Sequence, residues 1–135
     1  MPENCEVCLT SQYLNNKLNG KKIIDMSIIS GRYKKVLPKG FNEFKKLLKE
    51  STFNIDKVDS KGKFMWFEIS NKKNKYFILN TYGLSGRWSF ADLGYTRITF
   101  IIEDDNKYEL HYDDKLSFGT IEFTNDKKIL EKKLN

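Results

Sequence analysis

Apolar residues recur at helical spacing in two short stretches of the chain. Val7, Leu14 and Leu18 follow one another at intervals of seven and four, which places them on one stripe and predicts a helix over 3–18. Apolar residues at helical intervals, with lysines on the opposite side, predict a second helix over 41–50.

Most of the remaining chain alternates with a period of two, which is typical of strands. An isoleucine-rich run predicts a strand at 22–29, and 33–36 is a candidate continuation of the sheet. Six further strands are predicted at 53–59, 63–70, 75–80, 96–103, 107–113 and 118–124. Polar turns between successive strands indicate antiparallel hairpins. The expected fold class is α+β, mainly β: a two-sheet antiparallel β-sandwich with an N-terminal helix and a second short helix.

Both alternating sets of residues are largely apolar in 63–70, so this strand is expected to be central and covered on both faces. At 135 residues the chain is long enough for one domain. No apolar run is long enough to span a bilayer and no secretory signal is present, so we expect a soluble intracellular protein without a membrane partner. Residues 125–135 are expected to be a linker or the beginning of a helix.

The chain is basic, with 24 lysines and arginines against 18 acidic residues and a net charge of +6. Acidic residues gather between 103 and 114, which leaves the remaining surface more basic and suited to nucleic acid. The same lysine content also arises from AT-biased coding. A structural or interaction β-sandwich therefore stays open as an interpretation, and it predicts no salt-dependent affinity for DNA.

Cys5 and Cys8 form a lone CxxC motif near the start. A structural zinc ion needs about four ligands, and the sequence contains one histidine, His111. We therefore expect no metal and no cofactor, and both cysteines are expected to be small packing residues of a reduced protein.

The first three residues, Met1-Pro2-Glu3, carry candidate chemistry if the initiator methionine is removed. Pro2 would then offer a secondary amine. The pKa of an α-amino group is about 7.7–8.0, whereas that of lysine is about 10.4, so a larger fraction of the terminal amine is neutral and nucleophilic. Such an amine adds to a sugar aldehyde to give an iminium, and Glu3 could supply or remove protons. The alternative is that Pro2 begins the helix and Glu3 favours its positive end.

Four short motifs, in order and with plausible spacing, closely resemble one family. They are Met1-Pro2-Glu3 with Glu6-Val7, Lys61-Gly62-Lys63-Phe64, Gly83-Leu84-Ser85-Gly86-Arg87-Trp88, and Tyr112-Asp113-Asp114 followed by Phe118-Gly119-Thr120-Ile121. Residues 1–124 resemble the N-terminal catalytic domain of the formamidopyrimidine-DNA glycosylase and endonuclease VIII family. The resemblance implies a two-sheet sandwich followed by a helical domain and a zinc finger. Neither the helical domain nor the zinc finger is in this chain, and a separate chain is a candidate source of both.

The resemblance implies a role for three catalytic residues. Pro2 matches the nucleophile that attacks the sugar C1′ and leaves a Schiff base, and Glu3 matches the acid that protonates the opening sugar ring. Lys63 matches a lysine that acts beside the lesion phosphate and as a proton donor. Without the family, a lysine at the place of Lys63 is more often a solvated strand end than a catalytic residue.

Extrusion of a damaged nucleotide leaves a gap that side chains fill. Leu84 matches an inserting methionine of the family and Phe118 matches its inserting phenylalanine, while the alternative for both is packing on the core. Lys61 and Arg87 are candidates for contacts with backbone phosphates.

Departures from the family pattern affect specificity. Leu116-Ser117 replaces an Arg-Arg pair, so the arginine that reads the orphaned cytosine is absent. The leading hypothesis is a base-excision glycosylase and AP lyase domain that acts on damaged duplex or single-stranded DNA, including abasic sites. The alternative is a non-catalytic DNA-binding remnant of a truncated glycosylase.

Overall fold

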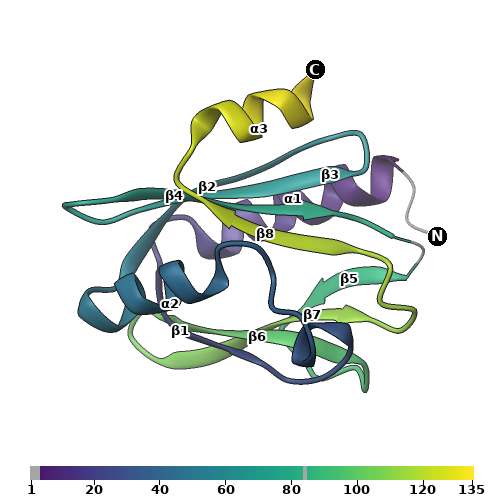
Figure 1. The fold of residues 1–135 in the computed structure, drawn as a ribbon, viewed down its shortest axis with the longest axis horizontal. Helices are drawn as coiled ribbons and strands as arrows, with labels where there is room; N and C mark the ends of the chain where they lie inside the picture. Colours follow the sequence, from purple (N-terminus) through teal and green to yellow (C-terminus); the bar gives the residue numbers. More distant parts are fainter. Residues whose placement is uncertain (1–3, 84) are drawn as a thin grey trace.

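The computed structural model describes residues 4–83 and 85–135. Three α-helices, eight strands and one 3₁₀ turn make up this part of the chain (Figure 1). In chain order they are α1 (Asn4–Leu18), β1 (Lys22–Ile28), the 3₁₀ turn (Arg32–Lys34), α2 (Phe41–Glu50), β2 (Phe53–Lys61), β3 (Phe64–Ser70), β4 (Lys75–Thr81), β5 (Gly86–Ser89), β6 (Thr96–Glu103), β7 (Lys107–Asp114), β8 (Thr120–Thr124) and α3 (Lys127–Leu134).

The eight strands form one antiparallel sheet in the order β5-β7-β6-β1-β2-β3-β4-β8. The predicted α+β class and the antiparallel pairing are confirmed, whereas two separate sheets are not found. The two halves are joined at β1, which pairs with β6 along its length but with β2 only at Lys22 and Ile23. The sheet bends at this narrow joint, so β5, β7, β6 and β1 form a first half-sheet and β2, β3, β4 and β8 a second.

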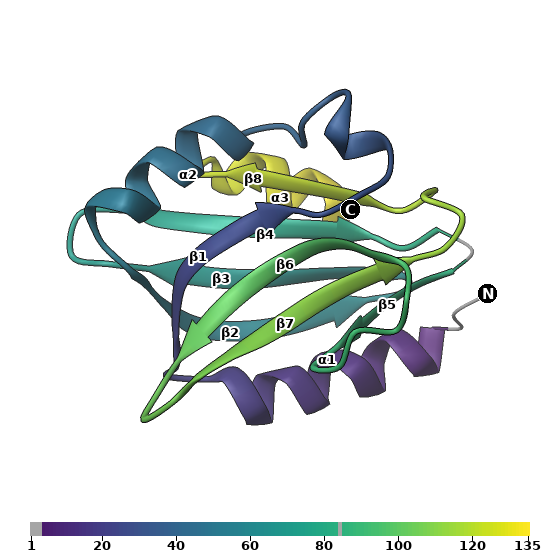
Figure 2. The same cartoon turned by 90° about the horizontal axis from the view of Figure 1, so that it is seen from below.

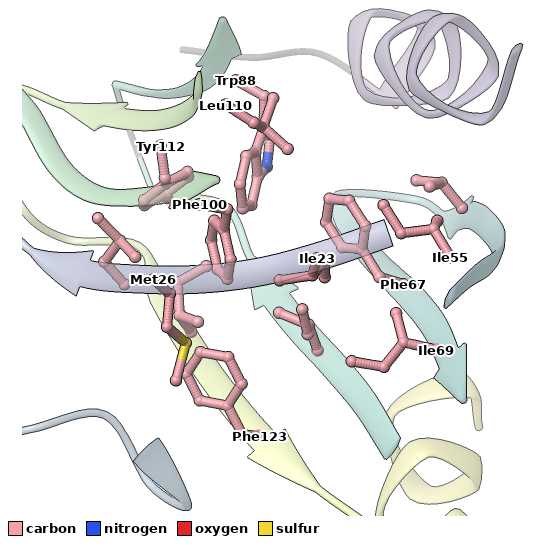
Figure 3. Packing of buried hydrophobic residues seen from close by; sticks show 14 of the residues in the cluster. Ile23, Met26, Ile55, Phe67, Ile69, Trp88, Phe100, Leu110, Tyr112 and Phe123 are labelled. Atoms are coloured by element: carbon pink, nitrogen blue, oxygen red, sulfur yellow. The ribbon is translucent and has the colours of Figure 1, made fainter. Parts of the chain in front are cut away.

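The hydrophobic core lies between the two half-sheets (Figure 3). Phe67 of the second half-sheet packs edge-on against Trp88 of the first, with ring centroids 5.1 Å apart. Phe100 of the first half-sheet and Phe123 of the second also meet, with tilted rings whose centroids are 6.3 Å apart. The bent sheet therefore buries its inner face as a sandwich would, without separating into two sheets.

The helices lie against the sheet (Figure 2). In α1 the predicted stripe of Val7, Leu14 and Leu18 is fully buried. Helix α2 has the predicted bounds, and its Phe44 packs against aromatic rings of β2, β4 and β8. Among the described helices, none combines the length and apolar character needed to cross a bilayer.

The expected coverage of β3 on both faces is confirmed. Its outer face carries Phe64 and Trp66, which stack at 5.6 Å and join residues of β4 in a second apolar cluster. Helix α3 closes this cluster with Leu130, which is 3% exposed. Residues 127–134 are thus an ordered helix packed on the sheet.

Four local predictions are wrong. Segment 33–36 does not continue the sheet, because Gly31 with φ 82° turns the chain into the 3₁₀ turn. The short edge strand β5 was not predicted, and β8 begins at Thr120 rather than at 118. Cys8 is exposed on α1 and not a packing residue.

Candidate nucleic-acid interface

Two loops cross between the half-sheets at the same end of the molecule (Figures 1 and 2). The first loop, 82–85, joins β4 to β5, and the second, 115–119, joins β7 to β8. Because β4 pairs with β8 and β5 pairs with β7, the two loops have to run side by side. A Cβ atom built on Gly83 would lie 2.6 Å from the amide nitrogen of Gly119, so the two backbones are in contact.

Asp114 joins the two crossing loops through its carboxylate, although its side chain is 1% exposed. Its Oδ1 accepts a hydrogen bond from Ser85 Oγ at 2.6 Å, and its Oδ2 accepts one from the Gly119 amide at 2.8 Å. Ser85 Oγ in turn accepts the amide hydrogen of Leu116 at 2.9 Å. One buried carboxyl group is therefore bonded to both loops.

Two of the arginines hold the second loop from outside. Arg97 donates from Nε to the Asp114 carbonyl at 2.8 Å and from Nη2 to the Lys115 carbonyl at 3.0 Å. Arg32 donates to the carbonyl of Gly119. These guanidinium groups are used structurally, whereas Arg87 on β5 is exposed to solvent.

The tip of the second loop presents apolar side chains to solvent. Phe118 is 63% exposed and Leu116 is 46% exposed, and between them Ser117 has a left-handed φ of 56°. The core alternative for Phe118 is therefore wrong, while its insertion into DNA stays a prediction. Leu84, the other expected wedge, lies outside the described residues.

Lys63 lies in the tight turn between β2 and β3, one residue before the strand that it was expected to begin. Gly62 takes φ 60° in this turn, and the Lys63 carbonyl accepts the amide hydrogen of Tyr82 from the first crossing loop at 3.3 Å. The Lys63 side chain is half-buried. Lys61 is exposed and donates from Nζ to the carbonyl of Leu134 at the end of α3. The hairpin turn is thus tied both to the crossing loops and to α3.

Helix α1 is anchored beside β2 by three hydrogen bonds in regular steps. Asn19 Nδ2 donates to the Asp56 carbonyl, the Val58 amide donates to Asn15 Oδ1, and Ser11 Oγ donates to Ser60 Oγ. Four helical residues rise about 6 Å, nearly the rise of two strand residues. Ser11 is thereby held beside Ser60, three residues before Lys63. Pro2 and Glu3 precede α1 and lie outside the described residues.

A cleft of about 550 Å³ opens between the first turns of α1 and the crossing loops. Glu6 and Thr10 line it from α1, opposite the exposed cations Arg87 and Lys115. Tyr82 forms part of the wall, and burial raises the pKa of its phenol far above the ordinary value. Tyr82 is therefore neutral at physiological pH and offers no base to the cleft.

Sequence reasoning gave no role to Ser85, Asp114 or Lys115. Ser85 and Asp114 lie inside two of the recognised motifs, but nothing in their spacing shows that their side chains meet. In the described part of the chain, no group of three or more His, Cys, Asp and Glu side chains is arranged to hold a metal ion.

This fold, a bent antiparallel sheet with an N-terminal helix, resembles that of solved Fpg structures. Residues 1–121 match the family described as the formamidopyrimidine-DNA glycosylase N-terminal domain, and this chain belongs to that family.

Individual proteins that are similar in sequence or structure agree with this family assignment. Formamidopyrimidine-DNA glycosylase of Mycoplasma mobile is 30% identical over 136 residues, which cover 97% of this chain and 46% of that protein. A mutant Lactococcus lactis Fpg bound to DNA containing Fapy-dG is similar with a TM-score of 0.78 and 25% identity, over 98% of this chain and 47% of that one. MutM in complex with DNA containing carbocyclic 8-oxo-G has the same TM-score and identity, over 99% and 49%. This chain spans about half the length of these relatives.

Proposed function

We propose that this chain is the catalytic domain of a base-excision DNA glycosylase with AP lyase activity, and that the amine of Pro2 is its nucleophile. The observation that carries the proposal is that the family match begins at residue 1. Met1-Pro2-Glu3 therefore stands where the family domain begins, directly before a helix whose first turns line the cleft.

The chemistry needs a neutral amine beside a proton source. The Pro2 nitrogen forms a bond to the sugar C1′ while the glycosidic bond breaks, and the base leaves with a proton. Glu3 protonates the opening ring oxygen, and the product is an iminium that joins Pro2 to the sugar. Loss of a C2′ proton then expels the 3′ phosphate, and water releases the enzyme by hydrolysis of the iminium.

Lys63 is proposed to act beside the lesion phosphate. Its turn follows Ser60, which is bonded to Ser11 of α1, and this is the reason for assigning Lys63 to the same site as Pro2. A cation at this place also favours the neutral form of a neighbouring amine, since two positive charges repel each other.

Damaged DNA is the proposed partner, because the Lactococcus lactis and MutM structures are complexes with DNA that carries a lesion or its analogue. Arg87 and Lys115 supply positive charge at the cleft, and Phe118 supplies an exposed apolar side chain at the tip of the second crossing loop. Phosphate contacts give affinity that falls with salt, so a titration of DNA binding against salt separates this proposal from a purely structural β-sandwich.

Borohydride trapping on an abasic-site oligonucleotide tests the nucleophile. The protein with Pro2 at its amino terminus should give a covalent adduct. It is compared with a form that retains Met1 and with the Pro2→Gly and Glu3→Gln variants. An adduct from the processed protein alone supports the amine of Pro2. If the folded and processed protein gives no adduct, the lyase proposal fails and the DNA-binding remnant becomes the better interpretation.

A further inference from the structure

The side chains of Ser85 and Asp114 have no part in the proposed chemistry, yet together they join the two crossing loops. We propose that these two residues form a brace that positions the Phe118 tip for insertion into a damaged duplex. The inference rests on the proposed function, since it concerns how the same site recognises DNA. Asp114 is then a positioning residue that acts through Phe118.

The tip needs such a brace because its apolar side chains are exposed and do not fix it by packing in the core. Phe118 is mostly exposed, and the preceding Ser117 holds a left-handed conformation that non-glycine residues seldom adopt. A mobile tip would lose conformational entropy on entering the base stack, whereas a tip that is already ordered avoids this cost.

The buried carboxylate suits the task because it accepts from both loops at once. Oδ1 is bonded to Ser85 of the first loop and Oδ2 to the Gly119 amide of the second, so one side chain holds both loops. Gly119 is required for this approach, because a Cβ atom there would lie 2.1 Å from the Tyr112 hydroxyl and 2.9 Å from Asp114 Oδ2.

The geometry distinguishes two replacements of Asp114. In Asp114→Asn the amide oxygen can still accept from Gly119, and the amide nitrogen can donate to Ser85 Oγ, whose second lone pair is not used by the Leu116 amide. The brace is therefore largely kept. Asp114→Leu has a similar shape and removes both bonds, so it should behave like a loss of the brace.

Ser85→Ala is the main test, because it leaves the buried carboxylate and the Gly119 bond in place. Ser89→Ala is its matched control, since Ser89 ends the strand that follows Ser85 and its Oγ also accepts a backbone amide hydrogen, that of Ala91, away from the tip. Both variants are compared with the wild-type chain by fluorescence anisotropy, on an undamaged duplex and on a duplex with a tetrahydrofuran abasic analogue opposite 2-aminopurine.

We expect Ser85→Ala to weaken binding to the abasic duplex about tenfold, equivalent to about 1.4 kcal/mol, and to leave binding to the undamaged duplex unchanged. The change in 2-aminopurine fluorescence on binding should be lost with it. Phe118→Ala should have the same effect, and the double variant should be no worse than either single one, because the brace acts through the tip. Asp114→Asn should restore most of the affinity that Asp114→Leu loses.

The brace is overturned if Ser85→Ala keeps the abasic preference of Ser89→Ala, or if its effect adds to that of Phe118→Ala. A wild-type chain that binds both duplexes equally overturns the proposed recognition of damage as well. Borohydride trapping on a single-stranded abasic oligonucleotide, which needs no insertion, separates these failures from a failure of the Pro2 chemistry.

Discussion

Truncation of Leu130 measures how much α3 contributes to the stability of this domain. Leu130 is 3% exposed and lies over an outer cluster formed by Phe64, Trp66, Phe77 and Leu79. Leu→Ala at buried sites costs about 2–5 kcal/mol, and the lower end applies where the surroundings can close over the cavity. Because α3 is a two-turn helix at the surface, we expect Leu130→Ala to lower the free energy of unfolding by about 2 kcal/mol.

Urea unfolding followed by tryptophan fluorescence is the assay, because Trp66 lies under α3 whereas Trp88 lies in the main core. Glu131→Ala is the matched control, since Glu131 is an exposed residue of the same helix and its replacement should change stability by less than about 0.5 kcal/mol. A signal from Trp66 that changes before the global transition would indicate that α3 detaches first.

The reasoning is refuted if Leu130→Ala and Glu131→Ala unfold at the same urea concentration with the same slope. A chain that ends at residue 124 extends the test. It should be destabilised more than Leu130→Ala and should bind a hydrophobic dye, because the aromatic pair on β3 would then face solvent. Equal stability of the shorter chain would show that the domain ends at 124.

Three further predictions concern the rest of the fold. Gly40→Ala should destabilise the protein by more than about 3 kcal/mol in thermal unfolding, because a Cβ atom there would lie 1.9 Å from a backbone carbonyl oxygen of β8. Gly20→Ala is the control: Gly20 has a similar φ but open space around it, so this variant should cost about 1–2 kcal/mol. The hydrogen bond from Lys45 lowers the pKa of Asp25, so the pair stabilises the fold above the ordinary carboxyl pKa of 3.8 and loses this effect as the pH falls through the lowered value. Asp25→Asn should therefore cost about 0.5 kcal/mol in urea at pH 7 and close to nothing at pH 2. Burial raises the pKa of Tyr82 above the ordinary 10.0, so above pH 10 this tyrosine ionises in the unfolded chain and not in the folded one. The free energy of unfolding should therefore fall by about 1.4 kcal/mol per pH unit on account of Tyr82. Tyr82→Phe should remove this contribution to the loss of stability in an alkaline titration.

Elements with strong periodicity were predictable from the sequence. The bounds of α2 were found because Phe41, Phe44 and Leu48 recur at helical spacing with lysines between them. Central strands were found because their alternation is long and unbroken. Strand β5 escaped because it has four residues, and only one of its side chains, Trp88, reaches the core as a large apolar group.

The candidate interface was predictable only in part, since its geometry depends on contacts distant in sequence. Phe118 could be proposed as a wedge from its motif, but its exposure follows from β8 beginning two residues later than the alternation indicates. The role of Asp114 had no sequence signal, because an acidic residue in an acidic stretch is expected on the surface. Its burial becomes favourable only when partners from both crossing loops are in place.

The convergence of the candidate residues follows from the direction of the strands. The β2–β3 turn carries Lys63, and β4, which is antiparallel to β3, ends beside that turn. Strand β8 begins there because it is antiparallel to β4, so the loop with Phe118 arrives at the same end. Helix α1 runs antiparallel to β2 along matched steps and therefore begins where β2 ends. Antiparallel connectivity alone thus brings the start of the helix, the lysine turn and the apolar tip together, and the Ser85–Asp114 hydrogen bond fixes the distance between the two crossing loops.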